Sequence, residues 1–434
     1  MKKIRLLRLE NSTKRKGMRT SAENLKPPFT MPFSISLTLA TAVSGAILFL
    51  STISSAAPTL GVRRPFNRIY AFGDSFTDTG NSRSGEGPAG FGHLSSFPYG
   101  MTYFKRPTNR YSDGRLTIDF VAQSMNLPFL PPYLSLRSTN GSNGTATDSY
   151  GVNFAVSGAT VIKHAFFAEN NLTLDMTPQS LETELGWFEK YLETFGTNEK
   201  VSLFKDSLFW IGEIGVNDYA YTVGSTVSSD TIRELSISTY TRFLETLLNK
   251  GVRHMVVQGH PATGCLTLAM SLAGEDDRDY LGCVQSVNNQ SYTHNLALQY
   301  KLKQLRIKYP NATIVYADYW NAYREVIKNP SKYGISEKFK ACCGIGEPYN
   351  FQVFETCGSA TATACKDPSR YINWDGVHLT EGMYKVMADM FLGGSFTRPK
   401  FSYLLNKKLK DENGKAGHRG PKWLRSSDVG LQSI

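Results

Sequence analysis

The sequence predicts a three-layer α/β/α domain built on a doubly wound, five-stranded parallel sheet. The first observation is that short apolar segments alternate with longer helical segments over residues 68–391, a pattern typical of a parallel sheet with helices on both faces. The second is that glycine-rich, polar turns directly follow three of the apolar segments. Ligands of such sheets gather outside the carboxyl ends of the strands, so the second observation also predicts where a site lies.

Five short segments rich in β-branched and aromatic residues are the expected strands. The first runs directly into Gly73-Asp74-Ser75, the second is followed by Ser157-Gly158, and the third is followed by Asn217. The expected strands cover residues 68–72, 151–156, 207–211, 254–258 and 313–317.

Start and stop residues mark the expected helices between these strands. Asp113 is the expected cap of a helix that reaches Phe120 and Val121, and Thr177-Pro178 opens a helix towards Phe195. Gly251 is the expected C′ residue of the next helix, which covers about 230–250. The last two expected helices cover about 288–308 and 380–391.

The net charge of +11 is concentrated at the two ends of the chain. Residues 1–56 carry +7 and residues 398–434 carry +6, which leaves residues 57–397 slightly acidic. A nucleic-acid-binding protein concentrates basic charge on its folded surface, so we expect no nucleic-acid partner. The expected organisation is a basic leader with a secretory signal in 1–56, one domain in 57–397, and a basic, flexible tail in 398–434.

Residues 27–62 carry no charge, and residues 33–53 are mostly apolar. A basic segment, an apolar run and the small residues Ser54-Ser55-Ala56-Ala57 are the parts of a cleaved secretory signal peptide. The basic segment is unusually long, and Met31 is an alternative start of the chain. The apolar run approaches spanning length, so a signal anchor is the alternative. The favoured prediction is secretion through the endoplasmic reticulum, with no membrane span after cleavage.

Six cysteines in a secreted chain predict three disulfides. Proximity in sequence favours Cys265 with Cys283, which leaves Cys342, Cys343, Cys357 and Cys365 to pair among themselves, with adjacent Cys342 and Cys343 bonding to different partners. Metal binding is the competing interpretation, but no Cys-x-x-Cys or His-x-x-x-His spacing supports it. Sequons that predict a glycoprotein begin at Asn140, Asn143, Asn171, Asn289 and Asn311.

Ser75 is the candidate nucleophile. The Gly-x-Ser-x-Gly elbow of α/β-hydrolases is absent from the sequence. Gly73-Asp74-Ser75 directly follows the first expected strand, and we expect a helix after it to aim its amides at the serine. By itself Gly-Asp-Ser is a common turn sequence, so a purely structural turn is the alternative interpretation.

A serine hydroxyl needs a base, a group that orients the base, and donors for the developing oxyanion. Of seven histidines, only His378 has a carboxylate three residues before it, Asp375, in a turn around Gly376. Oxyanion-hole candidates are the Ser75 amide, the Gly158 amide and the Asn217 side-chain amide. The alternatives are a surface histidine at 378 and ordinary turns at 158 and 217.

The ordered set of these motifs resembles the GDSL esterase/lipase family, which belongs to the SGNH hydrolases named for Ser, Gly, Asn and His in four sequence blocks. Three further stretches resemble plant-type members: Pro261-Ala262-Thr263-Gly264-Cys265, Cys342-Cys343-Gly344 and Tyr349-Asn350-Phe351. The resemblance spans residues 66–392. It implies a flavodoxin-like sandwich, a catalytic Ser75, His378 and Asp375, and an oxyanion hole of Ser75, Gly158 and Asn217.

The resulting hypothesis is a secreted serine ester hydrolase, a carboxylesterase or lipase-type acyl hydrolase that works through a covalent acyl-enzyme. The rivals are an acyltransferase with the same site and a non-catalytic secreted binding protein. The sequence predicts no cofactor and no metal, a small-molecule, lipid or glycan ester as substrate, and a monomer. It leaves acyl length open, with residues 91–99 and 129–150 as candidates for shaping the pocket.

Overall fold

The computed structural model describes residues 64–83, 92–137, 150–172, 174 and 176–413. The expected leader and signal, the sequons at Asn140 and Asn143, and the end of the expected tail lie outside the described residues. None of the helices within the described ranges is both long and apolar enough to cross a membrane.

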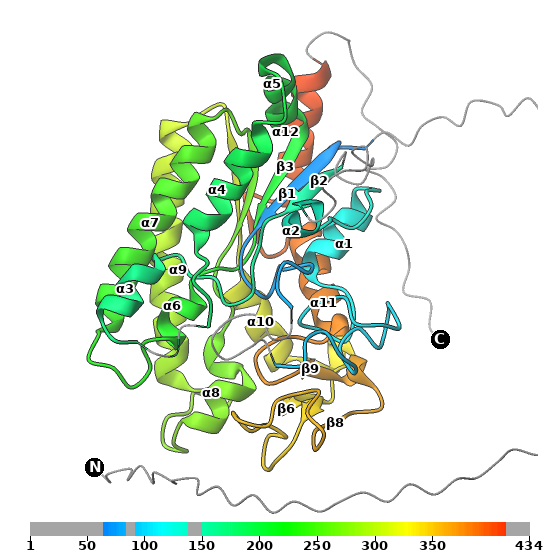
Figure 1. The fold of residues 1–434 in the computed structure, drawn as a ribbon, viewed down its shortest axis with the longest axis vertical. Helices are drawn as coiled ribbons and strands as arrows, with labels where there is room; N and C mark the ends of the chain where they lie inside the picture. The colour runs from blue at the N-terminus through cyan, green and yellow to red at the C-terminus, as the bar shows by residue number, and fades with distance from the viewer. Residues whose placement is uncertain (1–63, 84–91, 138–149, 173, 175, 414–434) are drawn as a thin grey trace, which may run out of the picture. The chain divides into compact units, whose positions relative to one another are not determined.

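All five expected strands are present, in the order expected of a doubly wound sheet (Figure 1). They are β1 (Arg68–Phe72), β2 (Gly151–Asn153), β3 (Ser207–Ile211), β4 (His254–Gln258) and β5 (Thr313–Ala317). The spatial order is β10-β5-β4-β3-β1-β2, and the five pair in parallel. The three-layer α/β/α prediction is therefore confirmed.

Two features of the sheet differ from the prediction. β2 ends at Asn153 rather than at residue 156, although the amides of Phe154 and Val156 still donate to β1 and to Gly73. A sixth strand, β10 (Thr397–Arg398), pairs antiparallel with β5 and covers that edge. Two residues carry too little pattern to be recognised as a strand from sequence.

Side chains of alternate strand residues enter two separate cores, one on each face of the sheet. Tyr70 and Phe209 pack with Phe188 and Phe243 on one face, beneath α4 and α7. Ile69 and Trp210 point to the other face, beneath α1, α10, α11 and α12. Figure 1 shows α4, α7 and α9 on one side of the sheet and α1, α11 and α12 on the other.

Each predicted helix is present, but α1 and α4 begin later in the sequence than predicted. Asp113 does not cap α1; its carboxylate accepts the Glu381 amide instead, and Leu116 precedes the helix. α4 begins after Ser180, because the Leu181 amide donates to Thr160 and keeps the preceding residues extended. The helices are α1 (Thr117–Ser124), α2 (Tyr133–Arg137), α3 (His164–Glu169), α4 (Leu181–Leu192), α5 (Thr197–Asp206), α6 (Val216–Ala220), α7 (Ser229–Asn249), α8 (Thr267–Leu272), α9 (Gln285–Lys308), α10 (Tyr319–Lys328), α11 (Glu381–Leu392) and α12 (Phe401–Asn413).

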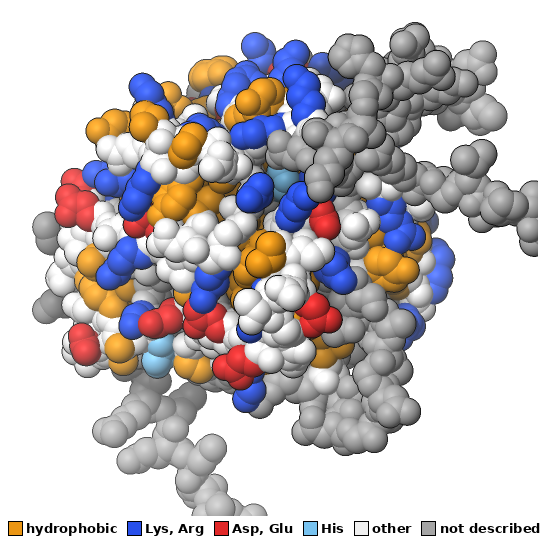
Figure 2. All heavy atoms as spheres, turned by 90° about the horizontal axis from the view of Figure 1, so that it is seen from above, with side chains coloured by type: hydrophobic (Ala, Val, Ile, Leu, Met, Phe, Trp, Pro, Cys, Tyr) orange, Lys and Arg blue, Asp and Glu red, His pale blue; other side chains and the backbone are white. Residues whose placement is uncertain are grey.

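The chain stays folded beyond residue 397, where we expected the flexible tail to begin. α12 buries Phe401 and Leu404 in the core beneath the sheet. Its Lys408 is almost fully buried and its ammonium lies 2.8 Å from an Asp206 carboxylate oxygen. Basic side chains on the face that α12 shares with α5 are spread among acidic and apolar ones (Figure 2).

Two small sheets and two of the three disulfides hold the segment between α10 and α11. β6 (Glu337–Ala341) pairs with β9 (Tyr371–Asn373), and β7 (Cys343–Gly344) pairs with β8 (Thr363–Ala364). The disulfides join Cys265 to Cys283, Cys342 to Cys365, and Cys343 to Cys357. The first pair is the one expected, and the other four cysteines pair among themselves as expected.

Candidate active site

Ser75 follows β1 in a tight turn, not in the helix that we expected there. Gly73 begins the turn with a φ of +142°, and a Cβ at this position would lie 3.0 Å from the Glu213 carbonyl oxygen. Only glycine meets both conditions without strain. The amides of Thr77 and Asp78 donate to the Asp74 carbonyl and close a single turn. Ser75 retains only 7% of its surface, so it is nearly buried.

Asp375 and His378 lie in a turn between β9 and α11. Gly376 adopts a φ of +97°, and a side chain there would collide with the Phe351 ring. The Asp375 carboxylate accepts the amides of Val377 and His378 at 3.1 and 2.9 Å. These bonds fix the carboxylate against the histidine ring three residues later.

Ser75, His378 and Asp375 form a series of hydrogen bonds, although Ser75 and His378 are 303 residues apart in the sequence. His378 Nε2 lies 2.7 Å from Ser75 Oγ. His378 Nδ1 lies 2.9 and 3.0 Å from the two Asp375 carboxylate oxygens. Since one ring nitrogen faces the acid, the other is left to accept the serine proton.

Two tyrosines from the long loop after β1 complete the surroundings of this series. The Tyr99 hydroxyl donates to Asp375 at 2.9 Å. The Tyr111 ring stacks on the His378 imidazole, with centroids 4.1 Å apart and planes 21° apart. Burial alone raises the pKa of Asp375, but the charge and ring N–H of His378 and the two backbone amides outweigh it and hold that pKa below its ordinary value.

The structure brings Gly158 and Asn217 to the same edge of the sheet as Ser75. Asn217 Nδ2 lies 3.2 Å from the carboxylate of Asp74, the neighbour of Ser75, and 3.0 Å from the carbonyl of Ala159, the neighbour of Gly158. The Gly158 carbonyl in turn accepts the Tyr221 hydroxyl at 2.8 Å. The five site residues expected from the sequence thus lie around one point at the carboxyl ends of β1, β2 and β3.

The match to known proteins agrees with this geometry. A family model described as GDSL-like Lipase/Acylhydrolase matches residues 69–391. The chain belongs to this family. A GDSL esterase/lipase from Arabidopsis thaliana is 84% identical over 379 residues, covering 87% of this chain and 99% of that protein. The sinapine esterase of Brassica napus is 37% identical over 371 residues, covering 81% of this chain and 90% of that protein.

Among solved structures, a catalytic mutant of an acetylxylan esterase from Geobacillus stearothermophilus aligns with a TM-score of 0.33 and 13% identity, over 75% of this chain and 93% of that one. The family assignment rests on the sequence matches and not on this alignment. As a GDSL esterase/lipase, the protein is an ester hydrolase.

A buried acidic pair lies beneath the site of this GDSL enzyme. Burial raises the pKa of Asp74 to about 6, and it raises the pKa of Glu213 well above its usual range. The negative charge of Asp74 raises the pKa of Glu213 further. The Asp74 carboxylate also accepts a hydrogen bond from Asn217 Nδ2.

Four residues of the site were missed from the sequence: Tyr99, Tyr111, Asp74 and Glu213. Asp74 belongs to the Gly-Asp-Ser motif, but its role depends on a contact with Asn217, 143 residues away. Tyr99 and Tyr111 lie in a glycine- and proline-rich loop without regular periodicity, and the only sequence signal was the aromatic content of residues 91–99. The aromatic content alone does not indicate which tyrosine ring contacts His378.

An apolar pocket of about 390 Å³ lies beside the GDSL site. Val216, next to Asn217, lines one wall, and Leu268, whose amide donates to the Gly376 carbonyl at 2.8 Å, lines another. The rest of the lining comes mainly from α6, α8 and α9, and none of it from the described parts of 91–99 and 129–150, the candidates named from the sequence. Among the described residues, no group of three His, Cys, Asp or Glu side chains is arranged to hold a metal ion.

Proposed function

We propose that Ser75 is the nucleophile of this ester hydrolase, with His378 as general base and Asp375 as the group that orients it. The observation that carries the proposal is the series Ser75 Oγ to His378 Nε2 at 2.7 Å and His378 Nδ1 to Asp375 at 2.9 Å. These lengths are within the range in which a base takes a hydroxyl proton directly. The ionised Asp375 stabilises the imidazolium that forms when His378 takes that proton.

The reaction proceeds in two acyl transfers. Ser75 Oγ attacks the ester carbonyl carbon while its proton moves to His378 Nε2. The carbon–oxygen bond to the alcohol then breaks, and His378 donates the proton to the leaving alkoxide. Water enters, loses a proton to His378 and attacks the acyl-enzyme. The bond between the acyl carbon and Ser75 Oγ then breaks, His378 returns the proton to Oγ, and the acid leaves.

The oxyanion formed in each half-reaction is stabilised by the backbone amides of Ser75 and Gly158 and by the side-chain amide of Asn217. Because Asn217 Nδ2 donates both of its hydrogens in this structure, the one on the Ala159 carbonyl turns to the oxyanion while the other stays on Asp74. Their common position at the ends of neighbouring strands supports this assignment. The two backbone amides are fixed before the reaction begins, so they need no reorganisation when the charge develops.

The substrate class that the surroundings favour is an ester with an apolar group larger than acetyl. The pocket is lined mainly by aliphatic side chains, among them Val216, which precedes Asn217, and Leu268, whose amide donates to the Gly376 carbonyl. Burial of an apolar group there contributes about 25 cal/mol for each Å² removed from water. We assign this pocket to the apolar part of the ester.

Secretion belongs to the same proposal. The signal-like residues 27–57 and three disulfides support an oxidising compartment.

The decisive experiment compares Ser75→Ala with wild type on an aryl ester of intermediate chain length. We expect kcat to fall by about 10⁴-fold or more, while a serine-reactive phosphonate no longer labels the protein. Ser202→Ala, at an exposed serine of α5, is the control and should keep full activity. Retained hydrolysis in Ser75→Ala would contradict the assignment.

A further inference from the structure

The imidazole ring of His378 is covered on one face by the ring of Tyr111. The two ring centroids are 4.1 Å apart and the planes differ by 21°, so the rings lie nearly parallel. Phe76 contacts the imidazole as well, but at 5.5 Å and at an angle of 50°. Among the described residues, Tyr111 therefore makes the closest aromatic contact with this histidine.

The neighbours of Tyr111 hold it in this position from both sides. Arg110 binds the Asp119 carboxylate on α1 through two guanidinium N–H groups, at 2.9 and 2.8 Å. Asp113 accepts the Glu381 amide at the start of α11, at 2.7 Å. Because the chain is fixed on either side of Tyr111, its backbone cannot shift away from the imidazole without breaking buried hydrogen bonds. The contact is part of the fold and is present without substrate.

The charged and titratable groups around His378 come from three segments. Asp375, in the same turn, faces Nδ1 at 2.9 Å. In the turn after β1, burial raises the pKa of Asp74, and the positive charge of His378 opposes that rise. The long loop before α1 supplies Tyr99, whose hydroxyl donates to Asp375, and Tyr111. The acids stabilise a positive charge on the ring from its surroundings, and Tyr111 contacts the ring face directly.

Tyr111 presents a neutral aromatic face to the imidazole. Burial raises the pKa of Tyr111 well above its usual range, and the charge of Asp375 raises it further, so the phenol stays protonated. The face of such a ring carries partial negative charge from its π electrons, and it attracts a cation within about 6 Å of its centroid. His378 is only 7% exposed, so little water competes with this attraction.

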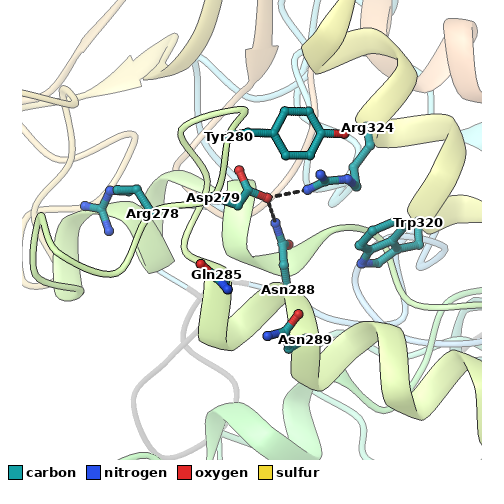
Figure 3. A pocket seen from close by; sticks show the side chains of 8 residues that line it. All are labelled: Arg278, Asp279, Tyr280, Gln285, Asn288, Asn289, Trp320 and Arg324. Atoms are coloured by element: carbon teal, nitrogen blue, oxygen red, sulfur yellow. Dashed lines mark hydrogen bonds and ion pairs between the residues drawn. The ribbon is translucent and has the colours of Figure 1, made fainter.

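The same kind of contact occurs elsewhere in the protein around a permanent cation. Figure 3 shows Arg324 between Tyr280 and Trp320, and its guanidinium carbon lies 5.2 and 4.6 Å from the two ring centroids. Asp279 accepts a hydrogen bond from the same guanidinium. That group is charged at all times, so its ring contacts contribute to stability. At His378 the cation forms only when the ring has taken a proton, so the ring contact is stronger in the transition state than in the resting enzyme.

We propose that Tyr111 stabilises the imidazolium form of His378 and holds the ring between Ser75 and Asp375. An interaction that is stronger in the charged state lowers the barrier to both acyl transfers, because the imidazolium forms in each. Tyr111 acts through His378 and is thus a positioning residue, whereas Ser75 and His378 react directly. The inference rests on the proposed role of His378 as general base.

The test measures kcat and the pH profile of kcat/KM for the full chain with substitutions at residue 111. Tyr111→Leu keeps an apolar side chain over the imidazole but removes the ring face. We expect kcat to fall about tenfold, and the acid limb of kcat/KM to move by about one pH unit towards acid, because the protonated base loses its partner. Tyr111→Phe keeps the ring face, so it should keep nearly wild-type values of both.

Two further variants separate the ring face from packing. Pentafluorophenylalanine at position 111 has nearly the shape of phenylalanine but a ring face of reversed partial charge, so it should reproduce both effects of Tyr111→Leu. This holds even if the leucine variant folds poorly. Tyr103→Leu removes a 43% exposed ring of the same loop, which packs against Phe104 and Arg115, and should change neither kcat nor the acid limb.

Wild-type kcat and an unmoved acid limb in Tyr111→Leu, or in the pentafluorophenylalanine variant, overturn the proposal. A lower kcat with an unmoved acid limb also overturns it, because the ring would then only pack, and so does an equal loss in Tyr111→Phe. In each case an inactive Ser75→Ala leaves the proposed function standing. If His378→Ala keeps its hydrolysis, the proposed function itself is wrong.

Discussion

Asn217 is positioned by acceptors on both sides of its amide nitrogen. Asp74 lies 3.2 Å from Nδ2 and the Ala159 carbonyl lies 3.0 Å from it. A side-chain amide turns freely about its last bond unless such contacts fix it. We infer that Asp74 is a positioning residue, which acts on the oxyanion through Asn217.

A double-mutant cycle tests this role. Asn217→Ala should lower kcat by about 10²–10³-fold with little change in KM, as for loss of an oxyanion donor. Asp74→Asn keeps the shape but weakens the acceptor, and it should lower kcat by about tenfold. In the Asn217→Ala background, Asp74→Asn should cost almost nothing further. An equal loss in both backgrounds would mean that Asp74 acts independently of Asn217.

Among the individual residues of the site, those that belong to the ordered motifs could be identified from the sequence. Ser75, Gly158, Asn217, Asp375 and His378 each follow a recognisable strand or precede a recognisable helix, so their convergence followed from the fold. Tyr111 was not predictable, because its stacking on His378 depends on the path of an irregular loop. The Asp74–Glu213 pair was not predictable either, because nothing local to either residue shows that both are buried together.

The element that the sequence misjudged most is α12. Its apolar residues Phe401, Leu404 and Leu409 are buried, but they belong to residues 398–434, which carry a net charge of +6. Charge indicated a solvated tail, whereas the spacing of three to five residues fits one buried helical face. Tertiary packing against the sheet decides between the two, and the strand β10 that guides the chain there is only two residues long.

Removing a core contact of α12 should destabilise the whole domain. Leu404→Ala deletes a side chain that is 0% exposed, and we expect the free energy of unfolding to fall by about 2–5 kcal/mol. Denaturant unfolding monitored by tryptophan fluorescence measures the change. Tyr403→Ala, at a neighbouring side chain that is 52% exposed, should change it by less than about 1 kcal/mol. Equal effects would show that α12 contributes little to the core.

The apolar pocket between α6, α8 and α9 predicts a change in chain-length preference. Ala269 lies on α8 and lines this pocket, so Ala269→Phe fills part of it. We expect kcat/KM to fall about tenfold or more for long acyl or aromatic esters and to change little for acetate, since each buried methylene contributes about 0.8 kcal/mol. Ala168→Phe, at an exposed position of α3, is the matched control. A uniform loss across the ester series would place the apolar group elsewhere.

Over the whole molecule, buried ionisable groups of two kinds act on stability in opposite directions. Burial raises the pKa of several carboxyls: to about 6 for Asp113, to about 7 for Asp218, and well above the usual range for Glu184. It also lowers the pKa of His254 and His260 to about 3. Together the described residues include six such carboxyls and three such histidines: Asp74, Asp78, Asp113, Glu184, Glu213 and Asp218, and His254, His260 and His294.

The carboxyls determine the pH dependence between about pH 5 and 7. A carboxyl with a raised pKa keeps its proton in the folded protein at a pH where the unfolded chain has lost it, so its contribution to stability falls as pH rises from about 4 through the folded pKa. A histidine with a lowered pKa acts the other way, because below about pH 6.5 the unfolded chain takes up a proton that the folded protein does not.

Six carboxyls outweigh three histidines, so we expect Tm to rise as pH is lowered from about 7 to about 5. Scanning calorimetry across this range measures the slope, and Glu184→Gln, which removes one of the six, should make it shallower. A Tm that instead falls from pH 7 to pH 5 would mean that the histidines dominate and that the carboxyls beneath the site ionise at their ordinary pH.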